Sequence, residues 1–399
     1  MVGNGVMNSF SVIFVALLSE FGLTRAELSG VFSVYIFVYF FASALVGPFL
    51  DRFGPRIVMP LGSLLIGLGL LCCSRISSPY QLYLFYGCIT SLGACCVGWV
   101  PNTTIIANWF VRRRGMAVGI VMCGSGMSMF IFIPLTQLMI ECIGWRGAFL
   151  TIALAVVIWL GPLNAIFQRT RPEDKGLAPN GVNYIPKKTT ENPKRTAAEI
   201  KLEWTLSEAI RHRSFWMMCF AFFCNPFATF TILLHQVAFI IERGFEPMYV
   251  ASALGFVGIF AMVGRFVGGT LSDSIGREMS YSLFMGAAAL AVTFLFFLNQ
   301  EYAWILTPYV VLVGLGMGVG GAMFPPIMAD LFPGPNLSRI MGISSVFSGM
   351  GAGLGSWLAG YLYDITGNYV WGFFCVLIAI LGAILFVWVA APRRTKVLL

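Results

Sequence analysis

The chain has 399 residues, of which 58% are hydrophobic and 11% are charged, and its mean hydropathy is +0.84. A protein of this size cannot expose so much apolar surface to water, so the composition excludes a soluble globular protein and indicates an integral membrane protein. The formal net charge of +8 alone would suit a nucleic-acid partner, but the basic residues lie mainly in loops between apolar stretches, which argues against one.

About twelve apolar stretches are long enough to cross a bilayer, which takes about 20 residues of helix. They lie at about 1–19, 28–50, 57–74, 80–107, 115–140, 146–168, 214–241, 248–271, 279–298, 302–328, 339–363 and 369–391. The first begins at Met1 without a flanking polar segment or a cleavage site, so it is predicted to be a retained helix and not a signal peptide. The expected fold class is an all-α integral membrane protein with twelve transmembrane helices.

Lys and Arg are distributed unevenly along the chain. Of the 25 basic residues, 20 lie in alternate loops or at the C-terminus, four lie in the other loops, and Arg265 lies inside an apolar stretch. The positive-inside rule therefore predicts a multi-pass protein of the cell (inner) membrane with both termini in the cytoplasm. This orientation accounts for the positive charge, and no nucleic-acid partner is expected.

The two halves of the chain resemble each other. GPFLDRFG at Gly47–Gly54 recurs as GTLSDSIG at Gly269–Gly276, 222 residues later (269 minus 47). GIVMCGSGM, which begins at Gly119, aligns with GISSVFSGM at Gly342 when one residue is added. This duplication predicts two six-helix bundles, at 1–168 and 214–391. Parallel repeats of this kind build secondary transporters whose substrate site lies at the midplane between the halves.

The segment at 169–213 is predicted to be a cytoplasmic linker, and 392–399 a cytoplasmic tail. The linker contains RPEDKGLAPNG and KKTTENPKR, whose proline and charge favour a solvated and partly disordered segment. Near its end, EWTLSEAIRHRSFW carries apolar residues at helical spacing, namely Trp204, Leu206, Ala209 and Ile210. This pattern indicates an amphipathic helix on the cytoplasmic face.

Arg265 is one of two ionisable residues predicted to lie well inside the spans. A charged side chain at mid-bilayer costs from roughly three to more than ten kcal/mol, so it is rarely left there without a partner or a task. The guanidinium keeps its proton and presents a planar fork that matches a carboxylate, so Arg265 suits a substrate anion. The alternative is a cation that backbone carbonyls or a helix end satisfy.

The other ionisable residue is His235, in LLHQVAFIIERG, seven residues before Glu242 and thus about 10 Å from that end of its helix. Histidine takes up and releases a proton near neutral pH, as proton symport requires. If helices 7 and 8 face a central cavity, a small anion could span His235 and Arg265. The alternative is a neutral histidine hydrogen-bonded across helices.

The fourth span supplies polar groups from the N-terminal half. In PNTTIIANWF, Pro101 frees a backbone carbonyl, and Asn102 and Thr104 could donate to a carboxylate. The alternative is that these side chains hold helices together, as polar residues in membranes often do. Further substrate-binding candidates are Asn8 on the first span and, one helical turn apart on the second, Tyr35 and Tyr39.

Charged residues occupy equivalent loops in the two halves. Asp51 and Arg52 follow the second span, and Asp273 and Arg277 follow the eighth. Charges at these helix ends could pair across the halves when a carrier faces outward and part when it faces inward, as a gate needs. The alternative, that they serve only to orient the protein, explains their repetition less well.

No enzyme or ATP-driven pump is indicated. The glycine runs GLGMGVGG and GMGAGLGS lie inside apolar spans without a following Lys-Ser/Thr or a βαβ context, so they indicate close helix packing and not a phosphate-binding loop. The ten cysteines show no metal-ligand spacing beside histidines, and no constellation of acid, base and nucleophile is visible. No catalytic residue, metal or cofactor is therefore expected.

Several motifs together resemble the major facilitator superfamily. GPFLDRFGPR after the second span and GGTLSDSIGR after the eighth are similar to its helix 2–3 and 8–9 loop motif. Its monocarboxylate-transporter and oxalate/formate-antiporter branch, in a bacterial form, is similar at NSFSVIF, FGLTRAELSGVFS, NWFVRRRGMAVGI, GWRGAF, RPEDKGLAPNG and YDITGNYVWGF. The resemblance implies transport of organic anions, and bacterial members of the branch have a histidine in helix 7, where this chain has His235.

The sequence departs from that branch in informative ways. Animal members have a Lys before the Ser in the first span and an Asp four residues before the helix 8 Arg, where this chain has Asn8 and Ala261. The oxalate exchangers pair the helix 8 Arg with a Lys in helix 11, but IMGISSVFSGMGAGLGSWLAGYLY contains no cation. These departures argue against the animal proton route and against a dianionic substrate.

The leading hypothesis is a secondary active transporter that carries small monocarboxylates, such as lactate or pyruvate, by proton symport and alternating access. Its partners would be a small organic anion, protons and the lipid bilayer, and it could work as a monomer. The nearest rival is an exchanger of formate, oxalate or a larger organic acid. A non-transporting membrane sensor is the alternative from another class.

Overall fold

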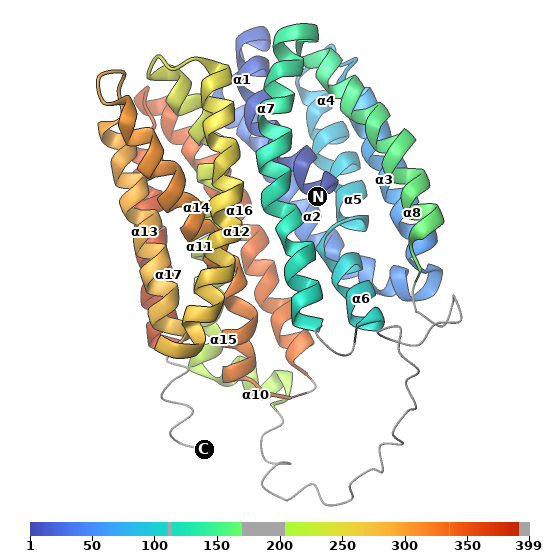
Figure 1. Ribbon diagram of the computed structural model, residues 1–399, viewed down its shortest axis with the longest axis vertical. Coiled ribbons are helices and arrows are strands. Elements are labelled where there is room, and N and C mark those ends of the chain that lie inside the picture. The colour runs from blue at the N-terminus through green and yellow to red at the C-terminus, as the bar shows by residue number, and fades with distance from the viewer. Residues whose placement is uncertain (111–113, 170–203, 335, 391–399) are drawn as a thin grey trace, which may run out of the picture.

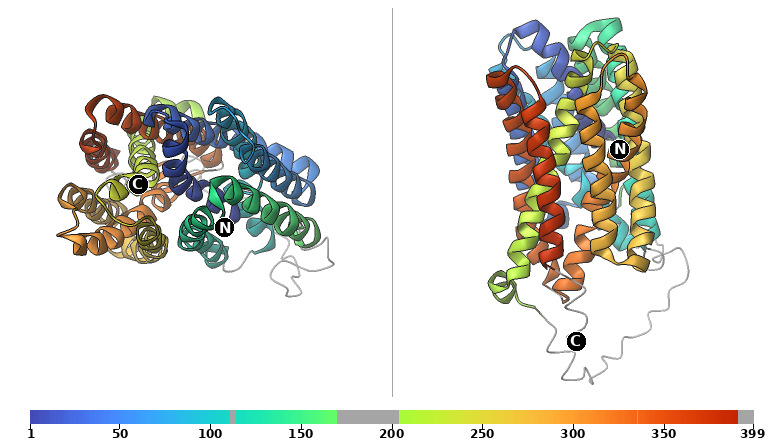
Figure 2. Two further views of the ribbon diagram at one scale, coloured as in Figure 1. Left: turned by 90° about the horizontal axis from the view of Figure 1, so that it is seen from above. Right: turned by 90° about the vertical axis from the view of Figure 1, so that its left-hand side faces the viewer.

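The computed structural model describes residues 1–110, 114–169, 204–334 and 336–390, and these residues are helical with no strand among them. The long helices run along one axis in two groups, the N-terminal helices in blue to green and the C-terminal helices in yellow-green to red (Figure 1). The groups stay distinct when seen along the helices (Figure 2). We call the end that holds α10 (Leu206–Arg211) the linker end, and the opposite end, where α1 (Val2–Phe21) meets α2 (Arg25–Phe53), the distal end.

The remaining N-terminal helices follow in chain order. They are α3 (Pro55–Cys73), α4 (Tyr80–Leu82), the π-helical η1 (Tyr83–Thr90), α5 (Ser91–Cys96), α6 (Trp99–Trp109), α7 (Arg114–Ala155), the π-helical η2 (Val156–Leu160) and α8 (Gly161–Phe167). α7 consists of two helices joined at Gly144, whose φ of 71° and ψ of 168° are not helical. Glycine adopts this positive φ without strain, so the chain can reverse there.

The C-terminal helices repeat the same plan. After α10 they are α11 (Arg213–Glu242), α12 (Pro247–Ile275), α13 (Arg277–Phe297), the 3₁₀ turn η5 (Ala303–Ile305), α14 (Leu306–Ala322), α15 (Phe324–Leu331), α16 (Leu337–Thr366) and α17 (Val370–Ala390). These bounds agree with the predicted spans to within a few residues.

Among the described residues, ten helical runs are long and apolar enough to cross a membrane. The sequence predicts about twelve, and two places account for the difference. The run Gly119–Phe167 counts once, although Gly144 divides it into the predicted fifth and sixth spans. α16 has 30 residues but is rich in glycine and serine, and it is not among the ten. The all-α class is confirmed, and the span count differs only at these places.

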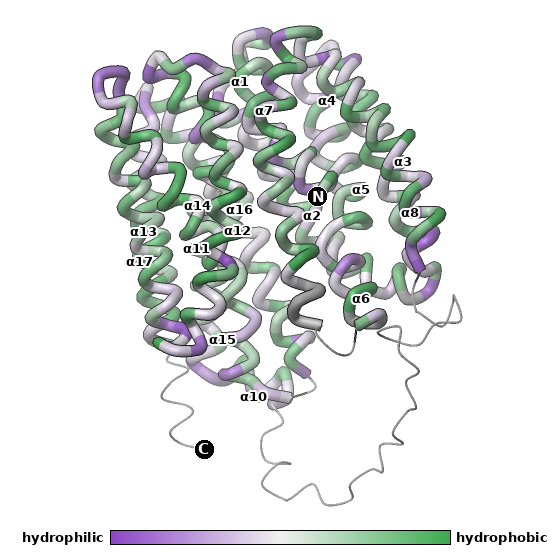
Figure 3. The backbone as a smooth tube through the Cα atoms, in the orientation of Figure 1, coloured by the Kyte–Doolittle hydropathy of each residue, from purple (hydrophilic) through white to green (hydrophobic). Residues whose placement is uncertain are grey.

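The outer surface of the helices is apolar, as a bilayer requires. Along α2, Phe37, Phe41, Leu45 and Phe49 recur every four residues, and each has more than half of its surface exposed. Hydrophobic residues dominate the middle of the helices, and many of the hydrophilic ones lie toward the two ends (Figure 3). Such a stripe is stable in lipid and would aggregate in water, so the chain is a multi-pass membrane protein.

Two spans are broken at equivalent places in the two groups. α5 and α6 are separated at Val97 and Gly98, and α14 and α15 at Met323. Pro101 lies in the first turn of α6 and Pro325 in the first turn of α15, 224 residues later (325 minus 101). Proline donates no backbone hydrogen bond and its ring clashes with the preceding turn, so each helix restarts there. The sequence predicts both stretches as continuous spans, and the breaks correct that prediction.

The two groups contact each other through α2 with α16 and through α7 with α12. Glycine allows the close approach of the backbones. A Cβ atom on Gly360 of α16 would lie 2.7 Å from the carbonyl oxygen of Arg25 on α2. A Cβ atom on Gly126 of α7 would overlap the carbonyl oxygen of Gly258 on α12. Small residues at helix contacts are typical of membrane bundles, where packing drives association.

α10 lies in the described part of the predicted linker. It begins with a capping box in which the backbone N–H and the hydroxyl of Thr205 donate to the Glu208 carboxylate, and these bonds hold the pKa of Glu208 below its ordinary value. Trp204 packs edge-on against Phe332, and Ala209 is fully buried. The apolar face of this short helix therefore lies against the C-terminal helices. Residues 170–203 of the predicted linker (169–213) and the whole predicted tail (392–399) lie outside the described residues.

Candidate functional site

Arg265 lies in the half of α12 that is nearer the linker end. It is 18 residues after Pro247 and eight before Asp273, about 27 Å and 12 Å along the helix at 1.5 Å per residue. Its side chain is half-buried, and Nη1 donates to the carbonyl oxygen of Met122 at 2.8 Å and to Oγ of Ser125 at 3.1 Å. Both partners belong to α7, so this cation links the two groups of helices.

No carboxylate among the described residues pairs with Arg265. A backbone carbonyl therefore satisfies part of the guanidinium, which is the alternative that the sequence leaves open. Nε and Nη2, in contrast, make no hydrogen bond with the described residues. Their N–H groups are available to an acceptor from outside the protein.

A strip of polar side chains on α7 connects Arg265 to the first helix. The hydroxyl of Ser128 donates to the carbonyl oxygen of Ser125 at 2.6 Å, and Nδ2 of Asn8 donates to Oγ of Ser128 at 3.2 Å. Asn8 is almost fully buried, with 3% of its surface exposed. The structure thus brings two predicted site residues, Asn8 and Arg265, to the same face of α7. The two serines that join them are absent from the sequence prediction.

His235 is fully buried between helices of both groups. Its Nε2 lies 2.8 Å from the carbonyl oxygen of Ser356 on α16 and 3.4 Å from Oγ of Ser29 on α2, and Nδ1 lies 3.4 Å from the hydroxyl of Tyr369. A carbonyl only accepts, so Nε2 carries the proton in this arrangement, and Nδ1 accepts from Tyr369. The imidazole is therefore satisfied as a neutral, hydrogen-bonded group that contacts both halves.

The structure does not bring His235 and Arg265 together. α11 ends and α12 begins at the distal end, and the two residues lie about 10 Å and about 27 Å from those helix termini. The difference in depth is about 17 Å, and the two residues have no hydrogen-bond partner in common. A small anion on Arg265 does not reach His235 in this arrangement.

The candidates on the fourth span bond within their own segment. Nδ2 of Asn102 donates to the carbonyl oxygens of Val97 and Gly98, at 2.9 Å and 2.6 Å, and the hydroxyl of Thr104 donates to the carbonyl oxygen of Val100 at 2.9 Å. Val97 is the residue four positions before Pro101. Asn102 thus satisfies carbonyls that the break between α5 and α6 leaves free, a discontinuity of the kind that lines substrate sites in transporters.

Tyr35 and Tyr39 of α2 face the other N-terminal helices. The rings of Tyr35 and Tyr86 stack with centroids 4.9 Å apart, and the buried Tyr35 hydroxyl has no hydrogen-bond partner among the described residues. The hydroxyl of Tyr39 accepts from the backbone N–H of Trp99 at 3.5 Å, where α6 begins. Both tyrosines are therefore part of the packing around the broken fourth span.

A cluster of charged and aromatic residues joins the two groups at the distal end. Arg25 at the start of α2 forms an ion pair with Glu242 of α11, and its guanidinium lies 3.9 Å from the ring centroid of Tyr363. The Asp364 carboxylate of α16 accepts from the backbone N–H groups of Arg25 and Ala26, at 2.9 Å and 2.8 Å. We call Arg25, Glu242, Tyr363 and Asp364 the distal cluster. They line a cavity of about 430 Å³ together with residues of α1.

The distal cluster is missing from the sequence prediction. Arg25 is one of four basic residues in the loops that carry few of them, and this placement is the signal that could have drawn attention to it. Asp364 is at a span end, where a charged residue needs no explanation. The partners become visible only when α2, α11 and α16 are packed together.

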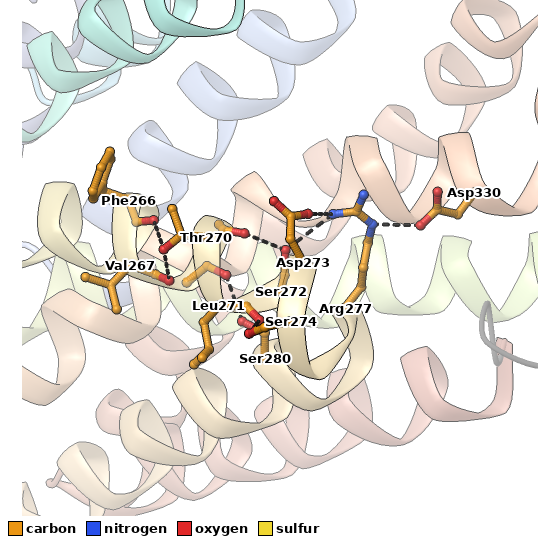
Figure 4. Close-up of polar contacts among 12 residues, drawn as sticks. Phe266, Val267, Thr270, Leu271, Ser272, Asp273, Ser274, Arg277, Ser280 and Asp330 are labelled. Carbon is orange, nitrogen blue, oxygen red and sulfur yellow. Dashed lines mark hydrogen bonds and ion pairs between the residues drawn. The ribbon is translucent and has the colours of Figure 1, made fainter.

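At the linker end, the two predicted gate residues of the C-terminal half, Asp273 on α12 and Arg277 on α13, contact each other. Arg277 lies between Asp273 and Asp330, with Nε donating to Asp330 at 2.7 Å and Nη1 3.7 Å from the Asp273 carboxylate (Figure 4). Its Nη1 also donates to the Ser272 hydroxyl at 3.3 Å. These residues all belong to the C-terminal helices, and Asp330, on α15, is absent from the predicted gate.

The equivalent residues of the N-terminal helices are Asp51 and Arg52, and Arg52 shows no such ion pair among the described residues. The Arg52 guanidinium lies 5.2 Å from the ring centroid of its neighbour Phe53. The side chain of Asp51 lies outside the described part of the chain. Pairing of these residues with Asp273 or Arg277 in another conformation stays a prediction.

A family model described as the Major Facilitator Superfamily matches residues 1–329 and 303–398. The chain belongs to this superfamily. Its two groups of helices thus have the fold of a membrane transporter superfamily.

Curated members of the superfamily show which relatives the chain resembles. Monocarboxylate transporter 13 of Bos taurus is 26% identical over 369 residues, which cover 92% of this chain and 81% of that protein. Monocarboxylate transporter 2 of Homo sapiens is 27% identical over 378 residues, which cover 90% of this chain and 76% of that protein. The resemblance inferred from the sequence motifs is confirmed at this level, and the relatives are transporters and not enzymes.

A solved structure confirms the fold. The crystal structure of a bacterial homolog to the human lysosomal transporter Spinster, in an inward-facing and occupied conformation, superposes with a TM-score of 0.70. The match covers 98% of this chain and 94% of that chain at 15% sequence identity. An arrangement shared at such low identity supports the superfamily fold.

Proposed function

We propose that this protein carries small monocarboxylates, such as lactate or pyruvate, by proton symport and alternating access across the cell (inner) membrane. The observation that carries the proposal is Arg265, a guanidinium inside a membrane-spanning helix that no carboxylate of the described residues neutralises. An uncompensated cation at this depth is costly. A substrate carboxylate that accepts from its free N–H groups would remove that cost and gain two charge-assisted hydrogen bonds.

The number of cations favours a monocarboxylate. Arg265 is the cationic side chain found well inside the described membrane helices, so a second carboxylate on the substrate would find no second arginine or lysine there. Relatives that are 26% and 27% identical are named monocarboxylate transporters, which supports the same substrate class. The rival is an exchanger of organic anions, because the same arginine would serve it equally well.

The uneven distribution of Lys and Arg between the two ends of the molecule supports one orientation in the membrane. Most basic residues lie in loops of the linker end or in the segments attached to it, so we assign this end and both termini to the cytoplasm. The distal cluster then closes the outer side by joining α2 to α11 and α16. The described contacts of Arg277 stay within the C-terminal helices, so the cytoplasmic ends can part without breaking them. This arrangement fits a carrier that is closed to the outside.

His235 is the candidate for proton coupling. With Nε2 bonded to the Ser356 carbonyl, an added proton would bind Nδ1, and the Tyr369 hydroxyl, which donates to that atom in this arrangement, would have to turn and accept. The ring of Tyr369 lies 5.2 Å from the Arg25 guanidinium of the distal cluster. Protonation would therefore act on the contacts that close the outer side. Coupling to a substrate on Arg265 would pass through this conformational change and not through direct contact.

Transport by purified protein in lipid vesicles tests the proposal. Radiolabelled lactate, pyruvate, formate, oxalate and larger acids would be offered with and without a pH gradient and with and without internal anions. Accumulation of lactate or pyruvate driven by the pH gradient alone is the expected result. Uptake that needs an internal anion would favour the exchanger. If no acid is taken up, the result would favour a non-transporting membrane sensor.

Arg265→Lys tests the binding residue. The variant keeps the charge but cannot make two parallel hydrogen bonds, so most carboxylate binding should be lost. Arg265→Gln should lose it as well, and Arg75→Lys, at an exposed loop position, is the matched control. Wild-type affinity in either Arg265 variant would show that this residue does not hold the substrate.

A further inference from the structure

The guanidinium of Arg265 is held at one of its three nitrogens. Nη1 donates to Met122 and Ser125, whereas Nε and Nη2 make no hydrogen bond with the described residues. A guanidinium offers a carboxylate two edges with parallel N–H groups, one formed by Nε and Nη2 and the other by the two terminal nitrogens. Because Nη1 is occupied, the edge formed by Nε and Nη2 is the one with both donors free.

The hydroxyl of Ser125 is oriented to accept from Arg265. It donates its single proton to the Met122 carbonyl oxygen at 2.8 Å, so its lone pairs are left for Nη1 at 3.1 Å. The backbone carbonyl of Ser125 accepts from Ser128, which in turn accepts from the buried Asn8 of α1. Ser125 is thus fixed by its own helix and supported by α1.

The close approach of α7 and α12 keeps these partners within reach. A Cβ atom on Gly126, next to Ser125, would overlap the carbonyl oxygen of Gly258, and one on Gly258 would overlap that of Gly126. The two backbones therefore touch near the level at which α7 holds the arginine. Larger residues at either glycine would push the helices apart and separate Ser125 from Arg265.

We propose that the Met122 carbonyl and the Ser125 hydroxyl form a clamp that positions Arg265, so that the edge formed by Nε and Nη2 binds the substrate carboxylate. This inference rests on the proposed function and adds Ser125 as a positioning residue. The clamp joins the two groups of helices, so the edge is held in place only while α7 and α12 are in contact. Carboxylate affinity then differs between conformations, which is the condition for a substrate to shift the equilibrium between them.

Equilibrium binding and transport by Ser125 variants test the clamp. We expect Ser125→Ala to weaken binding of radiolabelled lactate and pyruvate by about five- to tenfold, because the guanidinium can then turn away from the productive direction. KM should rise by the same factor, with kcat changed less than about twofold and the melting temperature unchanged. Ser125→Thr keeps the hydroxyl and should restore both affinity and KM.

Matched variants separate positioning from a structural role. Ser43→Ala also removes a half-buried serine hydroxyl that bonds its own helix, in this case the Tyr39 carbonyl, and should bind as the wild type does. Ser128→Ala removes the support without touching Arg265 and should weaken binding about twofold. If the melting temperature of Ser125→Ala is lowered, Ser125→Cys is the variant to use instead. It keeps a side chain of similar size whose sulfur is a poor acceptor, so it should show the same loss of affinity.

Each outcome either supports the proposed clamp or overturns it. Wild-type affinity in folded Ser125→Ala or Ser125→Cys would overturn it while leaving the proposed function intact. Tighter binding by Ser125→Ala would show that the hydroxyl competes with the substrate for Arg265, which also overturns it. If the wild-type protein binds no monocarboxylate, the proposed function fails and the clamp fails with it.

Discussion

The two ends of the molecule use charged residues in different ways. At the distal end, Arg25 of α2 pairs with Glu242 of α11, and Asp364 of α16 caps the start of α2, so charges join the two groups of helices. At the linker end, Arg277 pairs with Asp273 and Asp330 within the C-terminal helices. Contacts between two moving groups must break when the groups rock, whereas contacts within one group move with it. The distal cluster can therefore select a conformation, and the Arg277 cluster stabilises one group.

Charge reversal at the distal end should have the largest effect. Glu242→Arg replaces an attraction to Arg25 with a repulsion between the two groups, and the closed outer side should lose population. A change of only a few kcal/mol redistributes two such states, so we expect transport to fall by about tenfold or more. In a single-cysteine background, a cysteine at Ser19, which lines the distal cavity, should react faster with an impermeant thiol reagent.

Two further variants isolate the ion pair. The exchange Arg25→Glu with Glu242→Arg restores opposite charges and should recover much of the transport. Glu301→Arg adds the same charge to an exposed loop position near the distal end and should change little. Unaltered transport and unaltered labelling in Glu242→Arg would show that the pair does not hold the outer side closed.

His235 lies on α11, about 10 Å along the helix from Glu242 of the distal cluster. His235→Gln keeps hydrogen bonding but cannot titrate. It should flatten the rise in uptake that proton binding produces as the pH falls, because glutamine cannot take up a proton. Proton binding and substrate binding strengthen each other equally, so accumulation driven by a pH gradient should be abolished while exchange survives in part.

His212 provides the matched control at the linker end. It is the other histidine of the chain, and it packs against Trp204 outside the membrane helices. His212→Gln should leave the pH profile unchanged. If His235→Gln still concentrates substrate when only a pH gradient is supplied, His235 is a structural residue and the proton takes another route.

The sequence predicts buried charge better than it predicts the partners of that charge. Arg265 and His235 stand out because an ionisable residue in a long apolar run is costly wherever its partners are. The partners of Arg265, Met122 and Ser125, lie more than a hundred residues away in the chain and offer a backbone carbonyl and a common hydroxyl. Neither group has a signature in the sequence, since serine in a membrane helix usually bonds its own backbone.

The internal repeat likewise does not predict which residues contact each other. It predicts related helices in the two halves and draws attention to Asp273 and Arg277. The third member of their cluster, Asp330, lies on α15, a helix that exists because the tenth span is broken before Pro325. A hydropathy pattern averages over such a break, so the sequence places Asp330 at the end of a continuous span.

The linker end should respond weakly to the removal of one charge. Asp330→Asn takes one carboxylate from Arg277 but leaves Asp273 beside it. A partly exposed pair contributes about 1 kcal/mol or less, so we expect the melting temperature to fall by about 2–4 °C and transport to change less than about threefold. Labelling at Ser19 should stay as in the wild type. A tenfold loss of transport with increased labelling at Ser19 would show that this cluster also governs the opening of the outer side.

Labelling of single introduced cysteines tests which end of the molecule faces the cytoplasm. Cysteines introduced at Asp51 and Asp273, each in a single-cysteine background, should react with an impermeant reagent only from the cytoplasmic side, because the positive-inside rule assigns the linker end to the cytoplasm. Asp273 is well suited to the test because 76% of its side chain is exposed. A cysteine at Ser19 should react only from the outside. If intact cells label Asp51→Cys or Asp273→Cys, the orientation is reversed, and the distal cluster then closes the cytoplasmic side.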